Sequence, residues 1–272
     1  MEENGVWRTV GGRRIFIKEG QDLASAMKES GKFKEDKNNE NTISKIRKPQ
    51  DISLEEIKEI KEIADIRDED GFKQGIEKAV FDKYGMNKKY PQIVSDEEFK
   101  KYNGKEIYRG IGADSEEKAT KYKNEFLKGD IYSGYNNSGS GTWFTENKGI
   151  ADNYKSGGGG TTIKNGEYSF VIDAKIDNDA KIIKSSELPS KKERIMMYKL
   201  ENEPQLQKIV YDDGLYATML GYDVLETQVG FTQKFSNYSI LNREILKVKK
   251  WKIKMNLWPV GKNIKKVILK EK

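Results

Sequence analysis

The apolar residues of this chain come in short runs whose spacing switches repeatedly between that of strands and that of helices. Alternating runs at residues 106–111, 168–174 and 238–241 predict strands, and spacings of three and four residues predict helices between them. The strands and helices do not follow a regular strand–helix–strand order. The pattern therefore predicts an α+β fold of short strands with flanking helices over about residues 90–260.

Composition limits both the size of the core and the possible chemistry. Of the 272 residues, 35% are hydrophobic and 35% are charged, which predicts one modest core with polar segments outside it. The chain has no cysteine and no histidine, which excludes disulfides, thiolate metal sites, Ser-His-Asp triads and histidine bases. The net charge of +6 suits an anionic ligand and equally suits simple solubility. Any catalysis must use carboxylates, Arg, Lys, Tyr, Ser or Thr.

The N-terminal part is expected to be a small segment separate from the main fold. Residues 6–10 and 14–17 alternate like two strands joined by a Gly11-Gly12 turn. The first residues lack the apolar segment of a signal peptide, and no apolar run approaches the roughly 20 residues of a membrane span. We therefore expect a soluble protein without a cleaved signal or a membrane contact. The predicted division is a small segment (1–31), a polar linker (32–51) and a folded domain (52–272) that begins with helices.

Helix signals are clear in two places within this domain. Ser53 is followed three residues later by Glu56, a capping box that predicts a helix to about Asp68, and a second helix is predicted at 71–84. Further along, residues 205–220 are predicted to form one continuous helix. The first two of these helices are most simply the wall of a globular domain.

The stretch Ser138 to Tyr154, SGSGTWFTENKGIADNY, joins a short predicted strand to a short predicted helix. Alternation places Trp143 on one face of the strand, with Thr142 and Phe144 on the other. The helix returns the chain, so that the ring of Tyr154 can meet Trp143 around a flat ligand. The same two rings can also form a buried aromatic pair in an ordinary core, and this stretch leaves both interpretations open.

Arg109 stands in the middle of the apolar strand predicted at 106–111. A charge inside such a strand is costly unless it is paired. Arg109 therefore either serves a site or lies on a solvated edge strand. The glycines at 156–160 precede a predicted strand and not a helix, so they indicate a loop and no phosphate-binding site.

Three motifs occur in order along the chain: Tyr108-Arg109-Gly110, then Gly141-Thr142-Trp143-Phe144-Thr145 through Tyr154, then Gly221-Tyr222-Asp223 followed by terminal strands. Together they resemble the mono-ADP-ribosyltransferase superfamily over roughly residues 90–248. The spacing from Trp143 to Tyr154 is similar to the poly(ADP-ribose) polymerase pattern. Arg109, where that branch has His, is more similar to the Arg-Ser-Glu toxin branch. The resemblance implies a split sheet of short strands, with flanking helices, that encloses NAD.

The resemblance also implies which residues contact NAD, which would be a substrate, with no metal required. Arg109 would hold a phosphate or ribose oxygen through its planar fork. Trp143 and Tyr154 would stack on the positively charged nicotinamide. The implied NAD-binding residues are Arg109, Gly110, Ser140, Thr142, Trp143, Phe144 and Tyr154.

Cleavage of the nicotinamide–ribose bond passes through an oxocarbenium-like transition state that a carboxylate stabilises. The family usually places this Glu on a late strand, often in a Glu/Gln-x-Glu pair. Here Glu226 precedes Thr227-Gln228 in reversed order, and Asn237 stands on the next strand where related sequences can carry the Glu. We predict Arg109 and Glu226 as catalytic residues, with Asp223 and Glu244 as the alternative acids. If Glu226 is instead a solvated strand-end residue, the chain is an NAD-binding pseudoenzyme or uses a group of its substrate.

The N-terminal sequence WRTVGGRRIFIKEGQDLASAMKESGKF resembles a segment of phage head-morphogenesis (minor capsid) proteins, some of which carry C-terminal ADP-ribosyltransferase domains. The two resemblances imply a phage-encoded, toxin-like effector that transfers ADP-ribose from NAD to a host protein or nucleic acid. It would act in the bacterial cytoplasm, or on the virion through the capsid or portal. The alternatives are an NAD glycohydrolase and a non-catalytic phage structural or interaction protein.

Overall fold

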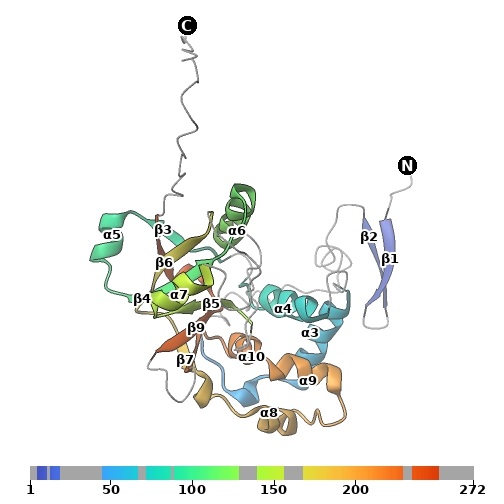
Figure 1. The fold of residues 1–272 in the computed structure, drawn as a ribbon. Helices are drawn as coiled ribbons and strands as arrows, with labels where there is room; N and C mark the ends of the chain where they lie inside the picture. Colours follow the sequence, from blue (N-terminus) through green and yellow to red (C-terminus); the bar gives the residue numbers. More distant parts are fainter. Residues whose placement is uncertain are drawn as a thin grey trace.

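The computed structural model describes residues 5–10, 13–18, 45–66, 72–86, 89–128, 140–155, 168–228 and 235–250. These residues form a two-stranded hairpin and an eight-stranded mixed sheet with flanking helices (Figure 1), in agreement with the predicted α+β class. In chain order the elements are β1 (Gly5–Val10), β2 (Arg13–Lys18), η1 (Pro49–Asp51), α3 (Leu54–Ile66), α4 (Phe72–Lys83), β3 (Gln92–Val94), α5 (Asp96–Lys101), β4 (Lys105–Ile111), α6 (Glu116–Lys128), β5 (Thr142–Thr145), α7 (Lys148–Lys155), β6 (Phe170–Ile176), β7 (Ile182–Lys184), η3 (Ser185–Glu187), α8 (Lys191–Met197), α9 (Pro204–Tyr211), α10 (Asp213–Met219), β8 (Val224–Gln228), β9 (Ser236–Ile240), η4 (Arg243–Ile245) and β10 (Leu246–Lys249).

The large sheet is joined at its centre by a single residue pair. Its strand order is β3-β10-β6-β4-β5-β9-β8-β7. β4 pairs with β6 along its whole length, and β5 pairs with β9 along its whole length. Between β4 and β5, the register in the described chain consists of Tyr108 opposite Thr145 alone. Beyond this pair the sheet separates into two four-stranded halves, and we call this separation the split.

The two faces of the sheet carry different layers. On the face that we call the α6 face, Phe126 of α6 packs on Phe144 of β5, with ring centroids 6.0 Å apart. On the opposite face, which we call the α7 face, Gly110 of β4 lies under α7. A group of helices, α3, α4, α8, α9 and α10, gathers beside the half of the sheet formed by β5, β9, β8 and β7 (Figure 1). Adjacent residues of β8 face these two layers, Val224 the core under α6 and Leu225 the core of the helical group.

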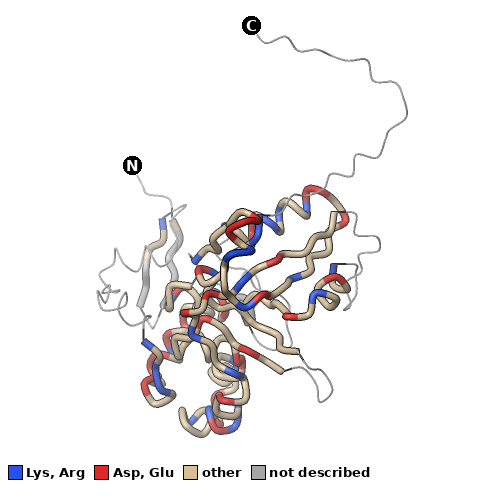
Figure 2. Tube along the Cα trace, turned by 90° about the vertical axis from the view of Figure 1, so that its left-hand side faces the viewer, with Lys and Arg blue, Asp and Glu red and all other residues tan. Residues whose placement is uncertain are grey.

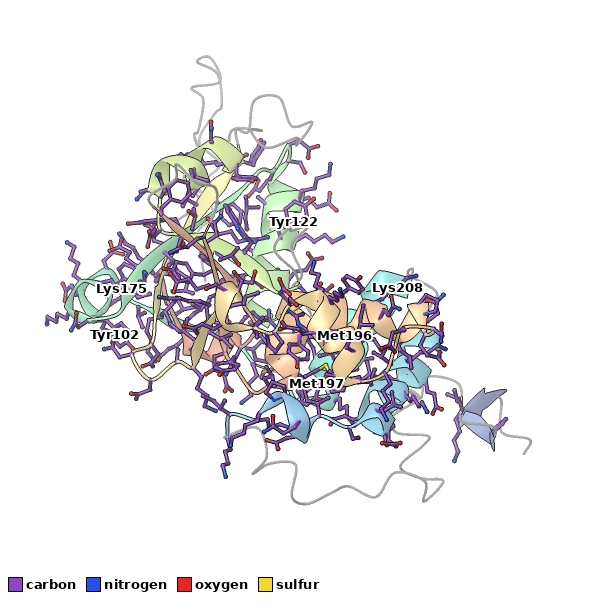
Figure 3. All side chains as sticks on the ribbon, turned by 90° about the horizontal axis from the view of Figure 1, so that it is seen from below. Tyr102, Tyr122, Lys175, Met196, Met197 and Lys208 are labelled. Carbon is purple, nitrogen blue, oxygen red and sulfur yellow. The ribbon has the colours of Figure 1, made fainter. Side chains whose placement is uncertain are left out.

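Near the β3 edge of the sheet, a lysine of β6 holds the short helix α5 in place. Lys175 Nζ donates hydrogen bonds to the carbonyl oxygens of Phe99 and Tyr102, each at 2.9 Å. In Figure 3, Lys175 and Tyr102 lie together on the left of the view, away from Met196, Met197 and Lys208. Ser95 begins α5 with a complete capping box, since its hydroxyl accepts from the Glu98 amide and the Glu98 carboxylate accepts from the Ser95 amide.

The structure places part of the predicted linker in the folded unit. The amide of Arg47 donates to the carbonyl of Leu220 at 2.9 Å, and the Tyr198 hydroxyl donates to the carbonyl of Pro49 at 2.8 Å. Residues 45–51 therefore pack on the helical group, although their polar composition predicted a linker to residue 51. Backbone hydrogen bonds and the partly buried Arg47 hold this segment, and neither feature is visible in the hydrophobic periodicity of the sequence.

Two predicted helices differ in detail from the structure. The Ser53 hydroxyl accepts from the Glu56 amide at 3.1 Å, but the carboxylate of Glu56 pairs with Arg47 and not with the Ser53 amide, so the predicted capping box is half formed. The continuous helix predicted at 205–220 is two helices, α9 and α10. Asp212 separates them because its backbone is extended and its side chain caps the Leu215 amide.

Glu56 forms a compact polar cluster with two partners, Arg47 and Tyr84. Both carboxylate oxygens accept from the Arg47 guanidinium at 2.8 Å, and one also accepts from the Tyr84 hydroxyl. Burial raises the pKa of Glu56, but the hydrogen bonds from Arg47 and Tyr84 outweigh burial and leave this pKa below its ordinary value of 4.5. The stabilisation is therefore fully present above about pH 4.5 and is lost as the pH falls through the lowered pKa.

Replacement of Glu56 by Gln should lower the free energy of unfolding by about 2 kcal/mol at pH 7, because two donors lose a charged acceptor. The difference between Glu56→Gln and wild type should shrink when urea unfolding is repeated at pH 3. Glu59→Gln is a matched control, since Glu59 pairs with Lys83 on the exposed side of the same helix and should cost little. An equal loss at both pH values would contradict the assignment.

Some of the remaining predictions are confirmed, and others concern residues that the structure does not describe. The N-terminal strands are confirmed, with Gly5 opposite Lys18 and Val10 opposite Arg13. The Gly11-Gly12 turn, residues 19–44, the glycine loop at 156–160 and residues 251–272 lie outside the described residues. Within the described residues, no helix has both the length and the apolarity needed to cross a membrane. Acidic and basic residues are interspersed over the described elements (Figure 2), so no one element concentrates the net positive charge.

Candidate functional site

A partly exposed aromatic pair lies beside the split. Trp143 of β5 and Tyr154 of α7 have ring centroids 5.0 Å apart, with a tilt of 57° between the rings. The turn between strand and helix is fixed locally, because Thr145 Oγ1 accepts from the Asn147 amide at 3.2 Å and Asn147 Oδ1 accepts from the Ile150 amide at 3.3 Å. These bonds begin α7 and return its last turn to Trp143. The rings of Trp143 and Tyr154 therefore contact each other, as the sequence predicted.

The rings contact each other in this structure, so a flat ligand does not fit between them as they stand. A ring stacked on both sides needs its neighbours roughly 7 Å apart, twice the usual carbon–carbon contact. Tyr154 is 36% exposed and lies in the last turn of α7, whereas Trp143 is held in β5. Opening of the pair would therefore move Tyr154 and leave Trp143 in place.

Arg109 bridges the split. Its side chain starts on the α6 face, since Arg109 is opposite Ile172 and two residues from the buried Ile107. The guanidinium Nη1 then donates to the carbonyl oxygen of Trp143 at 2.7 Å. Arg109 thus lies beside the strand that carries Trp143. Its present bond holds the strand that carries the aromatic ring, which differs from the predicted grip on a phosphate or ribose.

Gly110 allows α7 to lie directly on β4. A Cβ atom at this position would stand 1.8 Å from the carbonyl oxygen of Ala151 and 2.8 Å from the amide of Lys155. The backbone of α7 therefore approaches the strand more closely than any side chain at residue 110 allows. Gly110 was predicted to contact NAD, and the structure gives it this packing role beside the aromatic pair.

The other predicted NAD-binding residues lie at or under the start of β5. Ser140 donates to Asp212 through both its amide, at 2.8 Å, and its hydroxyl, at 2.9 Å, which ties β5 to the beginning of α10. Thr142 and Phe144 are buried on the α6 face, as the alternation predicted. Because Trp143 occupies the α7 face, the structure does not bring Ser140, Thr142 or Phe144 to the aromatic pair.

The predicted catalytic acid lies on the opposite face of the sheet from Trp143. Glu226 is opposite Tyr238, and Tyr238 is opposite Phe144, so these three side chains share the α6 face. The carboxylate of Glu226 accepts from the hydroxyl of Ser236 at 2.6 Å. The structure therefore does not bring Glu226, the predicted catalytic acid, to the aromatic pair.

The alternative acids, Asp223 and Glu244, also have other partners, away from the aromatic pair. Asp223 accepts from the Asn242 amide group at 2.8 Å and from the Lys181 backbone amide at 2.9 Å, which ties together the loops before β7 and after β9. Glu244 pairs with Lys89 at 2.6 Å beside β10. Neither residue belongs to β5 or its neighbour β9, the strands beside the aromatic pair.

A row of polar side chains crosses the α7 face next to Trp143. Asn237 is opposite Thr145 on one side and Thr227 on the other. Among the described residues, Asn237 Oδ1 and Thr227 Oγ1 are buried atoms without a hydrogen-bond partner. Leaving such an atom unpaired costs about 1–3 kcal/mol, which calls for an explanation. In the sequence, Asn237 stands out only as a replacement for an acid, and Thr227 has no visible role. The strand register, which the sequence does not show, places both beside Thr145.

Comparisons with protein-family models, with curated proteins and with solved structures give no match. Within the described residues, no group of three or more carboxylates is placed to hold a metal ion. The features of the structure that bear on function are therefore the split, the aromatic pair and the polar row.

Proposed function

We propose that the chain binds NAD at the split and transfers its ADP-ribose to a macromolecule, as a mono-ADP-ribosyltransferase. The observation that carries the proposal is the position of the Trp143–Tyr154 pair beside a sheet that is joined at its centre by one residue pair. Two aromatic rings beside this junction of strands suit a flat, cationic ring. The resemblance of the motifs to the ADP-ribosyltransferase superfamily supports the same ligand.

In this proposal the residues hold the substrate and favour departure of nicotinamide. Trp143 and Tyr154 stack on the nicotinamide ring, and Arg109 keeps the backbone of Trp143 in position through its carbonyl. The bond between the ribose C1′ and the nicotinamide nitrogen breaks, and its electron pair leaves with neutral nicotinamide. The acceptor nucleophile then forms a bond to C1′ and loses its proton to solvent. With water as the acceptor, the same steps give NAD hydrolysis.

A second candidate is an NAD-binding module without turnover. It is favoured by the placement of Glu226 on the α6 face and by the neutral Asn237 on the α7 face. In the transferase, a group of the acceptor would have to supply the negative charge that stabilises the developing cation. The phage setting and a bacterial host acceptor, a protein or a nucleic acid, remain part of the proposal through the N-terminal resemblance.

The proposal is tested by incubating the full chain with labelled NAD and a bacterial lysate, while free nicotinamide is measured in parallel. Label on a macromolecule is expected from wild type, and Tyr154→Ala should lose most of it. Tyr211→Ala is the matched control, because Tyr211 is 40% exposed at the end of α9 and takes no part in the site. Free nicotinamide without labelled macromolecule would indicate hydrolysis. NAD binding without either product would support the second candidate, the binding module without turnover. No label, no nicotinamide and no binding would overturn the proposal.

A further inference from the structure

We propose that the β3 edge of the sheet, together with residues 251–272, binds the surface of an anionic lipid bilayer. Residues 251–272, which we call the basic segment, lie outside the described residues. Their sequence holds seven lysines and one glutamate, a surplus of six positive charges that equals the net charge of the whole chain. Residues 1–250 are therefore neutral in sum, in agreement with the interspersed charges of the described elements (Figure 2). The basic segment thus supplies the net attraction to an anionic partner.

The basic segment is also rich in apolar residues. Ten of its 22 residues are hydrophobic, and they include two of the four tryptophans of the chain, Trp251 and Trp258. Segments that combine lysines with tryptophan and aliphatic residues are typical of proteins that bind at the interface of a bilayer, because the apolar side chains enter the lipid while the lysines meet anionic headgroups. Lysines alone would suit a nucleic acid equally well. The tryptophans and aliphatic residues favour the bilayer.

The described surface next to the basic segment exposes apolar side chains as well. β3 is an edge strand of the large sheet, and its neighbour is β10. Ile93 of β3 is 49% exposed, and Tyr90 is 39% exposed with the guanidinium of Arg243 5.5 Å from its ring centroid. The amide of Lys250 donates to the carbonyl of Val94 at 2.9 Å, so the basic segment begins beside this edge. Exposed apolar side chains and the start of the basic segment therefore belong to one region of the surface.

The division of roles between the two parts follows from the ion pairs at the edge. Lys249 of β10 pairs with Asp96 at 3.8 Å, and Lys89 pairs with Glu244 at 2.6 Å. These lysines already have acidic partners, so the edge contributes apolar contact and the basic segment contributes charge. A contact with the bilayer surface needs no membrane-spanning helix. The proposal therefore differs from the expectation of no membrane contact, which considered only a signal peptide and a membrane span.

The first test measures co-sedimentation of the full chain with vesicles of phosphatidylcholine alone and with vesicles of equal parts phosphatidylcholine and phosphatidylglycerol. Wild type should bind the mixed vesicles, bind them less as salt rises, and leave the neutral vesicles unbound. The double variant Lys265→Glu/Lys266→Glu should weaken this binding about tenfold or more. The matched control is Lys191→Glu/Lys192→Glu, which makes the same charge change at exposed residues of α8, away from β3 in Figure 1, and should bind nearly as wild type does.

The second test removes apolar groups without a change of charge. Trp251→Ser/Trp258→Ser should weaken binding to the mixed vesicles about tenfold or more, and Ile93→Gln should weaken it measurably. Both variants should melt without vesicles at the wild-type temperature, because Ile93 is half exposed and the tryptophans are assigned to the lipid.

Four results would overturn the proposal. Wild type could bind neither kind of vesicle, or bind both kinds equally. The tryptophan variant could retain vesicle binding, with salt-dependent binding to duplex DNA that also requires Lys265 and Lys266, which would indicate a nucleic-acid partner. The tryptophan variant could melt well below wild type without vesicles, which would mean that the basic segment packs on the folded chain. None of these measurements involves NAD, so failure here leaves the proposed function standing.

Discussion

Replacing Trp143 with Ala should weaken NAD binding about ten- to a hundredfold. Trp143 supplies the fixed face of the aromatic pair, with Tyr154 at 5.0 Å, and stacking of a base on an aromatic side chain is worth about 1–3 kcal/mol. The rise in melting temperature at saturating NAD measures the effect, because stabilisation follows the ratio of ligand concentration to dissociation constant. Trp143→Phe should keep most of the response, since it retains a ring on the same face.

The folded state should tolerate the Trp143→Ala substitution well enough to be tested, because the Trp143 side chain is only half-buried in β5, with its ring against that of Tyr154. A circular dichroism spectrum and the melting temperature without NAD separate a folding defect from a binding defect. An unchanged NAD response in a folded Trp143→Ala variant would exclude this face of the sheet as the nicotinamide site.

Replacing Gly110 with Ala should lower the free energy of unfolding by about 3 kcal/mol. The new Cβ would stand 1.8 Å from the carbonyl oxygen of Ala151, so the backbone of α7 must move off β4. Because Tyr154 lies on that helix, the variant should also lose its response to NAD. Urea unfolding measures the first effect, and the NAD-induced change in melting temperature measures the second.

Gly149→Ala is the matched control on the same helix. The nearest atom to a Cβ at Gly149 is the side-chain oxygen of Asn147 at 3.2 Å, so little has to move. Ala also favours a helix over Gly by up to about 1 kcal/mol. The control should be as stable as wild type or slightly more stable. If Gly110→Ala behaved like Gly149→Ala, close packing of α7 on β4 would not be what holds Tyr154 at the site.

Local features of the site could be predicted from the sequence because short-range geometry determines them. Alternation along four residues places Trp143 and Phe144 on opposite faces, as the structure has them. The spacing to Tyr154 depends on one turn and one short helix, both built by neighbouring residues. Arg109 in an apolar strand was open to two interpretations, a site residue or a solvated edge strand. The structure places β4 between β6 and β5, and Arg109 donates to the Trp143 carbonyl.

Features that depend on contacts between distant strands could not be predicted in the same way. The face that Glu226 occupies follows from its register with Tyr238, and this register is set by pairing across β8 and β9. The unpaired atoms of Asn237 and Thr227 become visible only once β8, β9 and β5 lie side by side. The break at Asp212 likewise arises because its side chain serves Ser140 and the start of α10 together.

The most direct test of the account is a calorimetric titration of the full wild-type chain with NAD, repeated with Trp143→Ala. The account predicts one saturable site per chain in wild type, with binding lost or weakened at least tenfold in the variant. Absence of saturable binding to wild type, or equal binding by both proteins, would contradict the claim that the aromatic pair beside the split is an NAD site.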